Sequence, residues 1–174
     1  MKVGLISDTH SYLDPKLERI FAGCDEIWHA GDWGNYDSTV PFLKNICPII
    51  KGVYGNIDGK NIRDEFPEYI CFEAERMKVS MIHIGNPRGI YTATLQNWLQ
   101  ADKPQIFICG HSHILKVFQD KKYKHLHMNP GAAGMHGFHH VRTVLRFEIN
   151  AGKMSNLEAI ELGPRTAENF PSAT

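Results

Sequence analysis

Five apolar runs in this chain each end at a polar side chain of a kind that binds metal ions. The runs are short and nearly continuous, like residues 2–7 (KVGLIS), which is typical of strands buried on both faces. In open α/β sheets the carboxyl ends of the strands form a ligand crevice. The sequence therefore predicts that the polar residues after these runs converge on one site: Asp8, His10, Asp32, Asn56, His83, His111 and His113.

The order of the expected elements indicates the fold class. Strand-like runs at 2–7, 26–29 and 47–54 alternate with helical patterns over 14–22 and from Ser38 onward. This alternation predicts a parallel α/β core. The remainder is richer in strands, and we expect strands at 69–72, 77–84 and 105–109, hairpins over 117–128 and 141–161, and a helix over 91–99.

Length and charge limit the classes of function. The 174 residues predict one domain over 1–163 and a polar tail over 164–174. The formal net charge is +0, so general nucleic-acid binding through a basic stripe is not expected. The chain shows neither a signal-peptide core nor an apolar run that could span a membrane, which favours a cytoplasmic protein without a membrane partner. The four cysteines form no CxxC pair, and we expect reduced thiols, with Cys47 and Cys109 buried in strands.

The predicted donor set favours divalent metal ions. Carboxylates, imidazoles and one amide form a mixed oxygen and nitrogen set without thiolate, which suits Mn, Fe, Zn or Co. Seven ligands are too many for one tetrahedral ion, so we expect two ions that share a carboxylate, about 3.5–4 Å apart. The middle residue of the DxH and HxH motifs would place both ligands on one side of an extended segment. Glycines before Asp32, Asn56 and His111 would allow sharp turns and close backbone approach.

The ordered set DxH, GD, GN, H and GHxH resembles the calcineurin-like metallophosphoesterase superfamily. With Asn129-Pro130-Gly131 it is most similar to the small bacterial and archaeal phosphodiesterase branch, over residues 1 to about 160. The resemblance implies a two-sheet α/β sandwich with outer helices. It also implies two divalent ions, with Mn foremost and Ni, Zn, Fe or Mg as alternatives, and a hydroxide between them as the nucleophile. Asp32 and Asn56 would be the catalytic residues among the ligands. The first ion would be held by Asp8, His10 and His113, the second by Asn56, His83 and His111, and both by Asp32.

Two positions depart from the family pattern. Many relatives have a histidine directly after the asparagine to protonate the leaving group, but here Ile57 follows Asn56. The acid is therefore open among His29, Asp58, His136 and a metal-bound water. After His83 the chain has Ile84-Gly85-Asn86 where relatives often have glycine, which changes the local loop.

For several further residues the sequence suggests two alternative roles. His29 could orient a ligand or be a half-buried strand residue. His125 and His127 are expected to be solvated or to pair across a hairpin, and the segment with His136, His139 and His140 to be a surface loop rather than a substrate-facing one. Arg88 could bind phosphate, although an exposed loop arginine is favoured, and for Trp33 packing is favoured over a place in the pocket wall.

The function that this resemblance implies is hydrolysis of a small phosphodiester, with nucleotide-like substrates included. The alternatives are a phosphomonoesterase on the same site and a non-catalytic scaffold like the retromer subunit related to this family. A non-catalytic scaffold would be expected to lose metal ligands by substitution. All seven candidate ligands are present here, so an enzyme is favoured. The sequence does not predict the oligomeric state, and a homo-oligomer is one of the alternatives.

Overall fold

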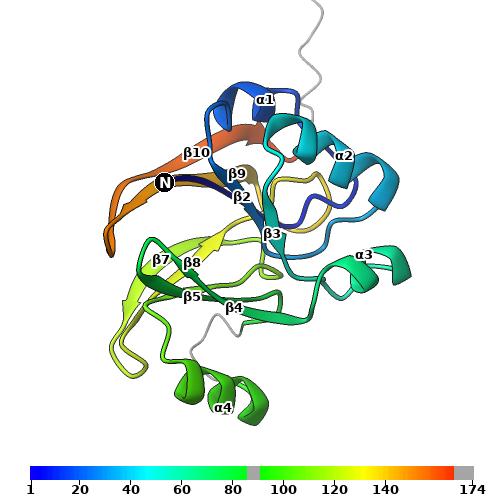
Figure 1. Ribbon diagram of the computed structural model, residues 1–174. Coiled ribbons are helices and arrows are strands. Elements are labelled where there is room, and N and C mark those ends of the chain that lie inside the picture. The colour runs from blue at the N-terminus through cyan, green and yellow to red at the C-terminus, as the bar shows by residue number, and fades with distance from the viewer. Residues whose placement is uncertain (86–90, 167–174) are drawn as a thin grey trace, which may run out of the picture.

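The computed structural model describes residues 1–85 and 91–166 of the chain, as two five-stranded sheets that face each other (Figure 1). Helices α1 (Lys16–Ile20) and α2 (Tyr36–Ile46) lie outside the first sheet, and α4 (Ala93–Asp102) lies outside the second. This arrangement confirms the predicted two-sheet α/β sandwich with outer helices. None of the helices within the described residues is long and apolar enough to cross a membrane.

The first sheet has the order β10-β9-β1-β2-β3. Strands β1, β2 and β3 run parallel and are joined through α1 and α2, as the alternating pattern predicts. Strands β9 and β10 form an antiparallel hairpin that extends the sheet on the β1 side. The strand bounds are Lys2–Ile6 for β1, Glu26–His29 for β2, Ile50–Gly52 for β3, Val141–Asn150 for β9 and Lys153–Pro164 for β10.

The second sheet has the order β4-β5-β6-β8-β7. Its three central strands, β5, β6 and β8, are parallel, and the edge strands β4 and β7 are antiparallel to their neighbours. The bounds are Tyr69–Ala74 for β4, Met77–Ile82 for β5, Ile106–Ile108 for β6, Leu115–Asp120 for β7 and His125–Pro130 for β8. A short helix, α3 (Lys60–Glu65), precedes β4.

The core lies mainly between the sheets. Leu5 and Trp28 from the first sheet and Met81 and Ile108 from the second are fully buried in one cluster. Two further apolar clusters seat the helices on the outer faces. Because both faces of the central strands are covered, their sequences are continuous apolar runs. The packing of the two sheets also brings the carboxyl ends of five strands close together: β1, β2, β3, β5 and β6.

The structure corrects three details of the expected elements. The third strand covers only Ile50–Gly52, and Cys47 lies at the C-terminal end of α2, buried but not in a strand. Asn35, not Ser38, caps α2, since its side chain accepts a hydrogen bond from the Ser38 N–H at 3.0 Å. Helix α3 was not predicted, because it is short and buries only Ile62. All four cysteines are free thiols, as predicted. The predicted domain boundary after residue 163 falls inside β10.

Candidate metal centre

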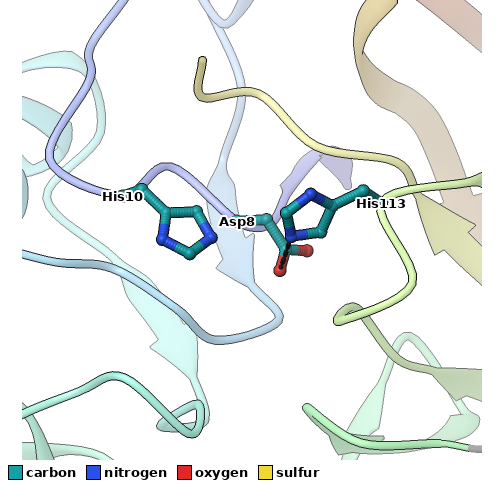
Figure 2. Close-up of side chains that lie close together, drawn as sticks. All are labelled: Asp8, His10 and His113. Carbon is teal, nitrogen blue, oxygen red and sulfur yellow. Dashed lines mark ion pairs between the residues drawn. The ribbon is translucent and has the colours of Figure 1, made fainter. Parts of the chain in front are cut away.

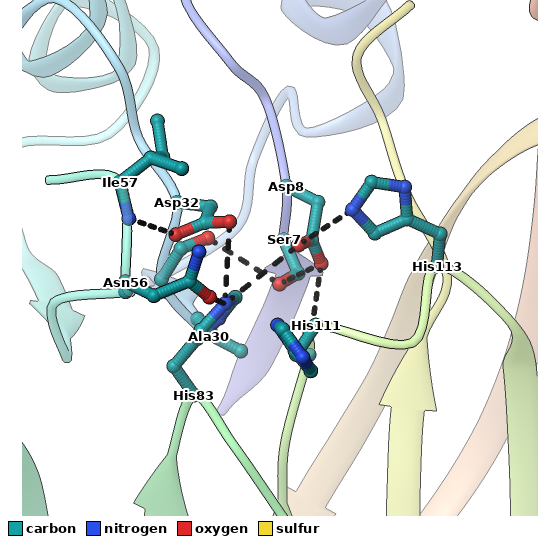
Figure 3. A network of polar contacts seen from close by, with 12 residues as sticks. Ser7, Asp8, Ala30, Asp32, Asn56, Ile57, His83, His111 and His113 are labelled. Carbon is teal, nitrogen blue, oxygen red and sulfur yellow. Dashed lines mark hydrogen bonds and ion pairs between the residues drawn. The ribbon is translucent and has the colours of Figure 1, made fainter. Parts of the chain in front are cut away.

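The polar residues that follow the apolar runs meet at one end of the sandwich (Figure 3). The first sheet supplies Asp8 and His10 after β1, Asp32 after β2 and Asn56 after β3; the second supplies His83 after β5 and His111 and His113 after β6. The seven residues singled out in the sequence are thus brought into one neighbourhood. The possible ligand atoms of six of them fall into two groups, and within each group these atoms lie within 4.8 Å of one another.

The first group contains Asp8, His10 and His113 (Figure 2). His113 Nε2 lies 3.1 Å from Asp8 Oδ1. The second group contains Asp32, His83 and His111. The Oδ1 atom of Asn56 lies 3.2 Å from His83 Nε2, so Asn56 adjoins this second group.

Asp32, a member of the second group, also lies close to the first group. Its Oδ2 atom is 3.3 Å from His83 Nε2 in the second group and 3.6 Å from His10 Nε2 in the first. One carboxylate oxygen therefore faces an imidazole nitrogen of each group. A ligand shared by two closely spaced ions would need such a position.

The fit of a cation is supported by buried atoms without hydrogen bonds. Asp8 Oδ1 and His10 Nε2 are buried, and neither has a hydrogen-bond partner among the described residues. His113 Nε2 is near Asp8 Oδ1 but is not in hydrogen-bonding geometry with it. A buried polar atom left without a partner costs about 1–3 kcal/mol, and a metal ion would remove that cost.

A hydrogen bond sets the orientation of His83. Its Nδ1 lies 2.8 Å from the Ala30 carbonyl oxygen, which can only accept, so Nδ1 carries the proton. Nε2 faces the oxygens of Asp32 and Asn56, and it would offer its lone pair to a metal ion that replaces the proton there. A histidine that donates one ring N–H to a backbone carbonyl is the usual arrangement of a metal ligand.

Neighbouring donors also hold the two carboxylates. The Ser7 hydroxyl donates to Asp8 Oδ2 at 2.6 Å, and the His111 N–H donates to the same oxygen at 3.2 Å. The Ile57 N–H donates to Asp32 Oδ1 at 3.1 Å. Each carboxylate therefore has one oxygen fixed by the protein and the other oxygen turned toward the imidazoles (Figure 3).

Protonation of the site follows from burial and from neighbouring charge. Burial lowers the pKa of His10 and His111, which favours the neutral imidazole that binds metal. Burial alone would raise the pKa of Asp32, but hydrogen bonding to His83 and its charge outweigh burial and lower it. Burial likewise would lower the pKa of His83, but the carboxylates of Asp32 and Asp8 raise it.

The backbone at the site is unusual. Five of the seven residues have positive φ, between +46° and +64°: Asp8, His10, Asp32, His111 and His113. The expectation that DxH and HxH are extended segments was therefore wrong, since both motifs lie in turns. A non-glycine residue in this region costs roughly 1–2 kcal/mol, and such strain clusters at functional sites.

Close approach of the loops requires glycine at two positions. A β-carbon on Gly31 would lie 2.6 Å from His83 Nδ1, and one on Gly55 would lie 2.0 Å from Asp32 Oδ1. Both distances are far too short for real carbon atoms. The expected close backbone approach is confirmed, and each glycine lets its loop pack directly against a candidate ligand.

The structure separates the candidates for a proton donor. His29 is fully buried and stacked on Trp33, with its ring nitrogens bonded to Thr9 and to the Gly31 N–H. Asp58 is buried and accepts hydrogen bonds from the N–H groups of Gly34 and Gly55. Both residues fix loops of the site. Trp33 is buried in the core, so packing is its role, as favoured.

The loop over 134–140 was expected to be a surface loop away from the site, but it lies against the site. The ring of His136 lies 4.8 Å from that of His10, and His139 lies 5.3 Å from His113. Gly137 is so close that a β-carbon there would come within 2.1 Å of His113 Nδ1. His136 and Phe138 thus join the candidate ligands in the wall of a pocket of about 240 Å³. The glycines in GAAGMHG were the signal of this close packing.

His125 and His127 are buried and not solvated, which corrects one part of the expectation. The cross-strand part is confirmed, because His125 is paired with Asp120 and His127 with Phe118 between β8 and β7. The Tyr91 hydroxyl lies 3.4 Å from a ring nitrogen of each histidine. Asn86 and Arg88, for which a loop shape and a phosphate contact were considered, lie outside the described residues.

Comparison with known proteins gives the family and the fold. The model of the calcineurin-like phosphoesterase superfamily domain matches residues 1–152. Phosphodiesterase MJ0936 of Methanocaldococcus jannaschii is 27% identical over 135 residues, which cover 69% of this chain and 77% of that protein. A solved archaeal phosphodiesterase superposes with a TM-score of 0.72 at 22% identity, covering 93% of this chain and 100% of its own.

The same fold occurs in a protein of another kind. Vps29 of Entamoeba histolytica, solved in complex with zinc, superposes with a TM-score of 0.71 at 19% identity, covering 95% of this chain and 100% of its own. At such identity the likeness shows the fold alone. The family model, in contrast, spans most of the sequence and includes all seven residues of the site. The chain therefore belongs to the calcineurin-like phosphoesterase superfamily.

Proposed function

We propose that this protein is a metal-dependent phosphodiesterase with two divalent ions. The observation that carries the proposal is the position of Asp32, with one oxygen 3.3 Å from His83 Nε2 and 3.6 Å from His10 Nε2. In this proposal Asp32 would be a ligand of both ions. Asp8, His10 and His113 would hold the first ion, and Asn56, His83 and His111 would hold the second.

The ions, when bound, lower the pKa of a water nucleophile and neutralise the charge of the phosphoryl oxygens. The mixed donor set supports Mn²⁺ as the working ion, with Ni²⁺, Zn²⁺, Fe²⁺ or Mg²⁺ as substitutes. The remaining residues bind and orient. Asn56 is exposed beside His83, where its amide can contact the phosphoester, and the 240 Å³ pocket admits a small substrate. A cytoplasmic location remains a prediction.

The residue after Asn56 favours a diester. Ile57 is 48% exposed at the pocket and has no proton to donate to a leaving group. A site without that donor depends more strongly on its ions and on a leaving group that departs unaided. The phosphodiesterase relative from Methanocaldococcus supports the same reaction class.

Two other functions use the same residues. A phosphomonoesterase would bind its substrate in the same pocket. A non-catalytic scaffold is suggested by the fold shared with Vps29. Because that Vps29 was solved with zinc, metal binding does not separate a scaffold from an enzyme. Turnover does.

The test is a metal-reconstitution assay. The protein is stripped with chelator, and hydrolysis of bis-p-nitrophenyl phosphate and p-nitrophenyl phosphate is measured with Mn²⁺, Ni²⁺, Zn²⁺ or Mg²⁺. We expect metal-restored turnover of the diester, loss of nearly all of it in Asp32→Asn and His111→Ala, and retention in the matched surface variants Asp37→Asn and His140→Ala. Faster turnover of the monoester would favour the second function, and no turnover with any ion would favour the scaffold.

A further inference from the structure

A second and larger cavity opens beside the candidate metal centre. It has a volume of about 690 Å³, against 240 Å³ for the pocket over the candidate ligands, and the two share Asn56 in their walls. His83 also lines the larger cavity. A phosphoester at the metal centre would therefore direct one of its ester groups into this cavity, which we call the side groove. Its volume falls in the range of about 300–1,000 Å³ that is typical of small-molecule sites.

Two aromatic side chains line the side groove, and each is held by a contact with another residue. The Trp98 ring is stacked on Tyr69, with ring centroids 4.6 Å apart, and the Tyr69 hydroxyl donates to Asp102 at 2.6 Å. The Tyr54 ring lies 4.2 Å from the Arg63 guanidinium. Fixed aromatic surfaces bind a planar ligand with little loss of side-chain entropy.

Arg63 is itself anchored. Its Nε donates to the Asp58 carbonyl oxygen at 2.7 Å and its Nη2 donates to the Gly55 carbonyl oxygen at 3.3 Å. Gly55 and Asp58 flank Asn56, so the same guanidinium that supports Tyr54 also fixes the loop that carries a candidate ligand. The side groove and the metal centre thus share one anchored segment, which carries Asn56.

The polar groups of the side groove favour a neutral, hydrogen-bonding ligand. Arg63 contributes one positive charge and Glu68 one negative charge, so the lining does not select a further phosphate. The Tyr54 hydroxyl donates to Glu68 at 3.3 Å, and Thr94 adds another hydroxyl. A purely hydrocarbon ligand would displace water from Glu68 and Thr94 without replacing its hydrogen bonds, at a cost in binding free energy.

We propose that the side groove binds the nucleoside half of a nucleoside phosphodiester, with the base against Trp98 and the sugar hydroxyls near Glu68. The inference rests on the proposed function, because the metal centre must hold the phosphodiester. Stacking on aromatic side chains recognises any base through its flat face. Ile84, which is 50% exposed in the lining, supplies apolar contact beside the ring.

The kinetic test compares two diesters with the same leaving group. We expect kcat/KM for the p-nitrophenyl ester of thymidine 5′-monophosphate to exceed that for methyl p-nitrophenyl phosphate by about tenfold or more. Trp98→Ala should lower kcat/KM for the thymidine ester and so remove most of this preference. Trp98→Phe, which keeps a stacking ring, should retain it. Glu68→Gln, an exposed position, should weaken the preference even if Trp98→Ala fails to fold.

Equal kcat/KM for the two diesters, or a preference that survives in both Trp98→Ala and Glu68→Gln, would overturn the nucleoside assignment. A preference for an octyl ester over the thymidine ester would overturn it as well, in favour of a lipid-like substrate.

A binding measurement separates this inference from the proposed function. Trp28 and Trp33 are fully buried and Trp98 is partly exposed, so a ligand in the side groove should quench Trp98 fluorescence alone. With Mg²⁺ present, thymidine 5′-monophosphate should quench it and ribose 5-phosphate should not, and Trp98→Phe should abolish the response. Quenching without turnover of any diester would support nucleoside binding in the side groove and overturn the proposed phosphodiesterase function. The absence of both quenching and turnover would overturn the nucleoside inference and the proposed function together.

Discussion

Gly55 lies so close to Asp32 that a β-carbon on Gly55 would come within 2.0 Å of the carboxylate oxygen Oδ1. Gly55→Ala should therefore push the Asp32 carboxylate out of position and weaken binding of Mn²⁺ by at least about tenfold, as calorimetric titration would measure. The matched control is Gly59→Ala in the same loop, because a β-carbon there meets nothing within 4 Å. Equal affinity in the two variants would show that the contact with Asp32 is not needed for metal binding.

Metal ions should stabilise the folded chain strongly. An ion at about 100 times its Kd adds about 2.7 kcal/mol per site, which for a chain of this size raises Tm by roughly 5–10 °C. Differential scanning calorimetry of chelator-treated protein, before and after Mn²⁺ is added, measures the shift. Asp32→Asn should lose most of it. A shift of the same size in that variant would place the stabilising ion elsewhere.

The Thr9 hydroxyl should be needed for stability rather than for metal chemistry. It donates to the Trp33 carbonyl oxygen at 2.9 Å and lies 3.1 Å from His29 Nε2. Since His29 Nδ1 accepts from the Gly31 N–H, Nε2 carries the proton and donates to Thr9. Thr9→Val would leave the buried His29 Nε2–H without an acceptor, while the Trp33 carbonyl oxygen keeps the Ser11 N–H. The expected cost is about 1–3 kcal/mol in the free energy of unfolding measured with urea. Thr94→Val, at an exposed position, should change stability little.

Acid should destabilise the fold through His127. Burial, the first cause, and the charge of His125 lower the pKa of His127 from 6.5 to about 4. The unfolded chain then binds more protons than the folded chain between these values, so stability falls as pH drops from about 6.5 to about 4, by up to about 3 kcal/mol.

The measurement is the free energy of unfolding against pH for the wild type, for His127→Gln and for the exposed control His140→Gln. The histidines of the metal centre contribute equally in all three proteins, so the difference in slope isolates His127. A slope in His127→Gln as steep as in the control would contradict the assignment.

The strand ends were the most predictable part of this protein. Apolar runs such as residues 2–7 end where side chains that can bind metal begin, and this change of residue type is visible in the sequence. The parallel order of β1, β2 and β3 follows from the alternation of strand and helix. The position of the candidate ligands could therefore be predicted from the sequence once the runs were identified as strands.

Other features depend on contacts that local sequence does not encode. His125 and His127 alternate with apolar residues, a pattern typical of a solvated face, yet Tyr91 and Tyr123 cover that face. The approach of loop 134–140 to His10 and His113 depends on how the two sheets pack. Helix α3 lacks an apolar stripe, so periodicity gives no sign of it.

The division of the ligands between the two sheets has a consequence for folding kinetics. Asp8 and His10 come from the first sheet and His113 from the second, and in the other group Asp32 comes from the first and His83 and His111 from the second. Neither sheet alone carries a complete group, so an ion is captured only after the sheets have docked. Contacts that form after the transition state slow unfolding and leave the folding rate unchanged. Metal should therefore lengthen the lifetime of the native state without making the chain fold faster.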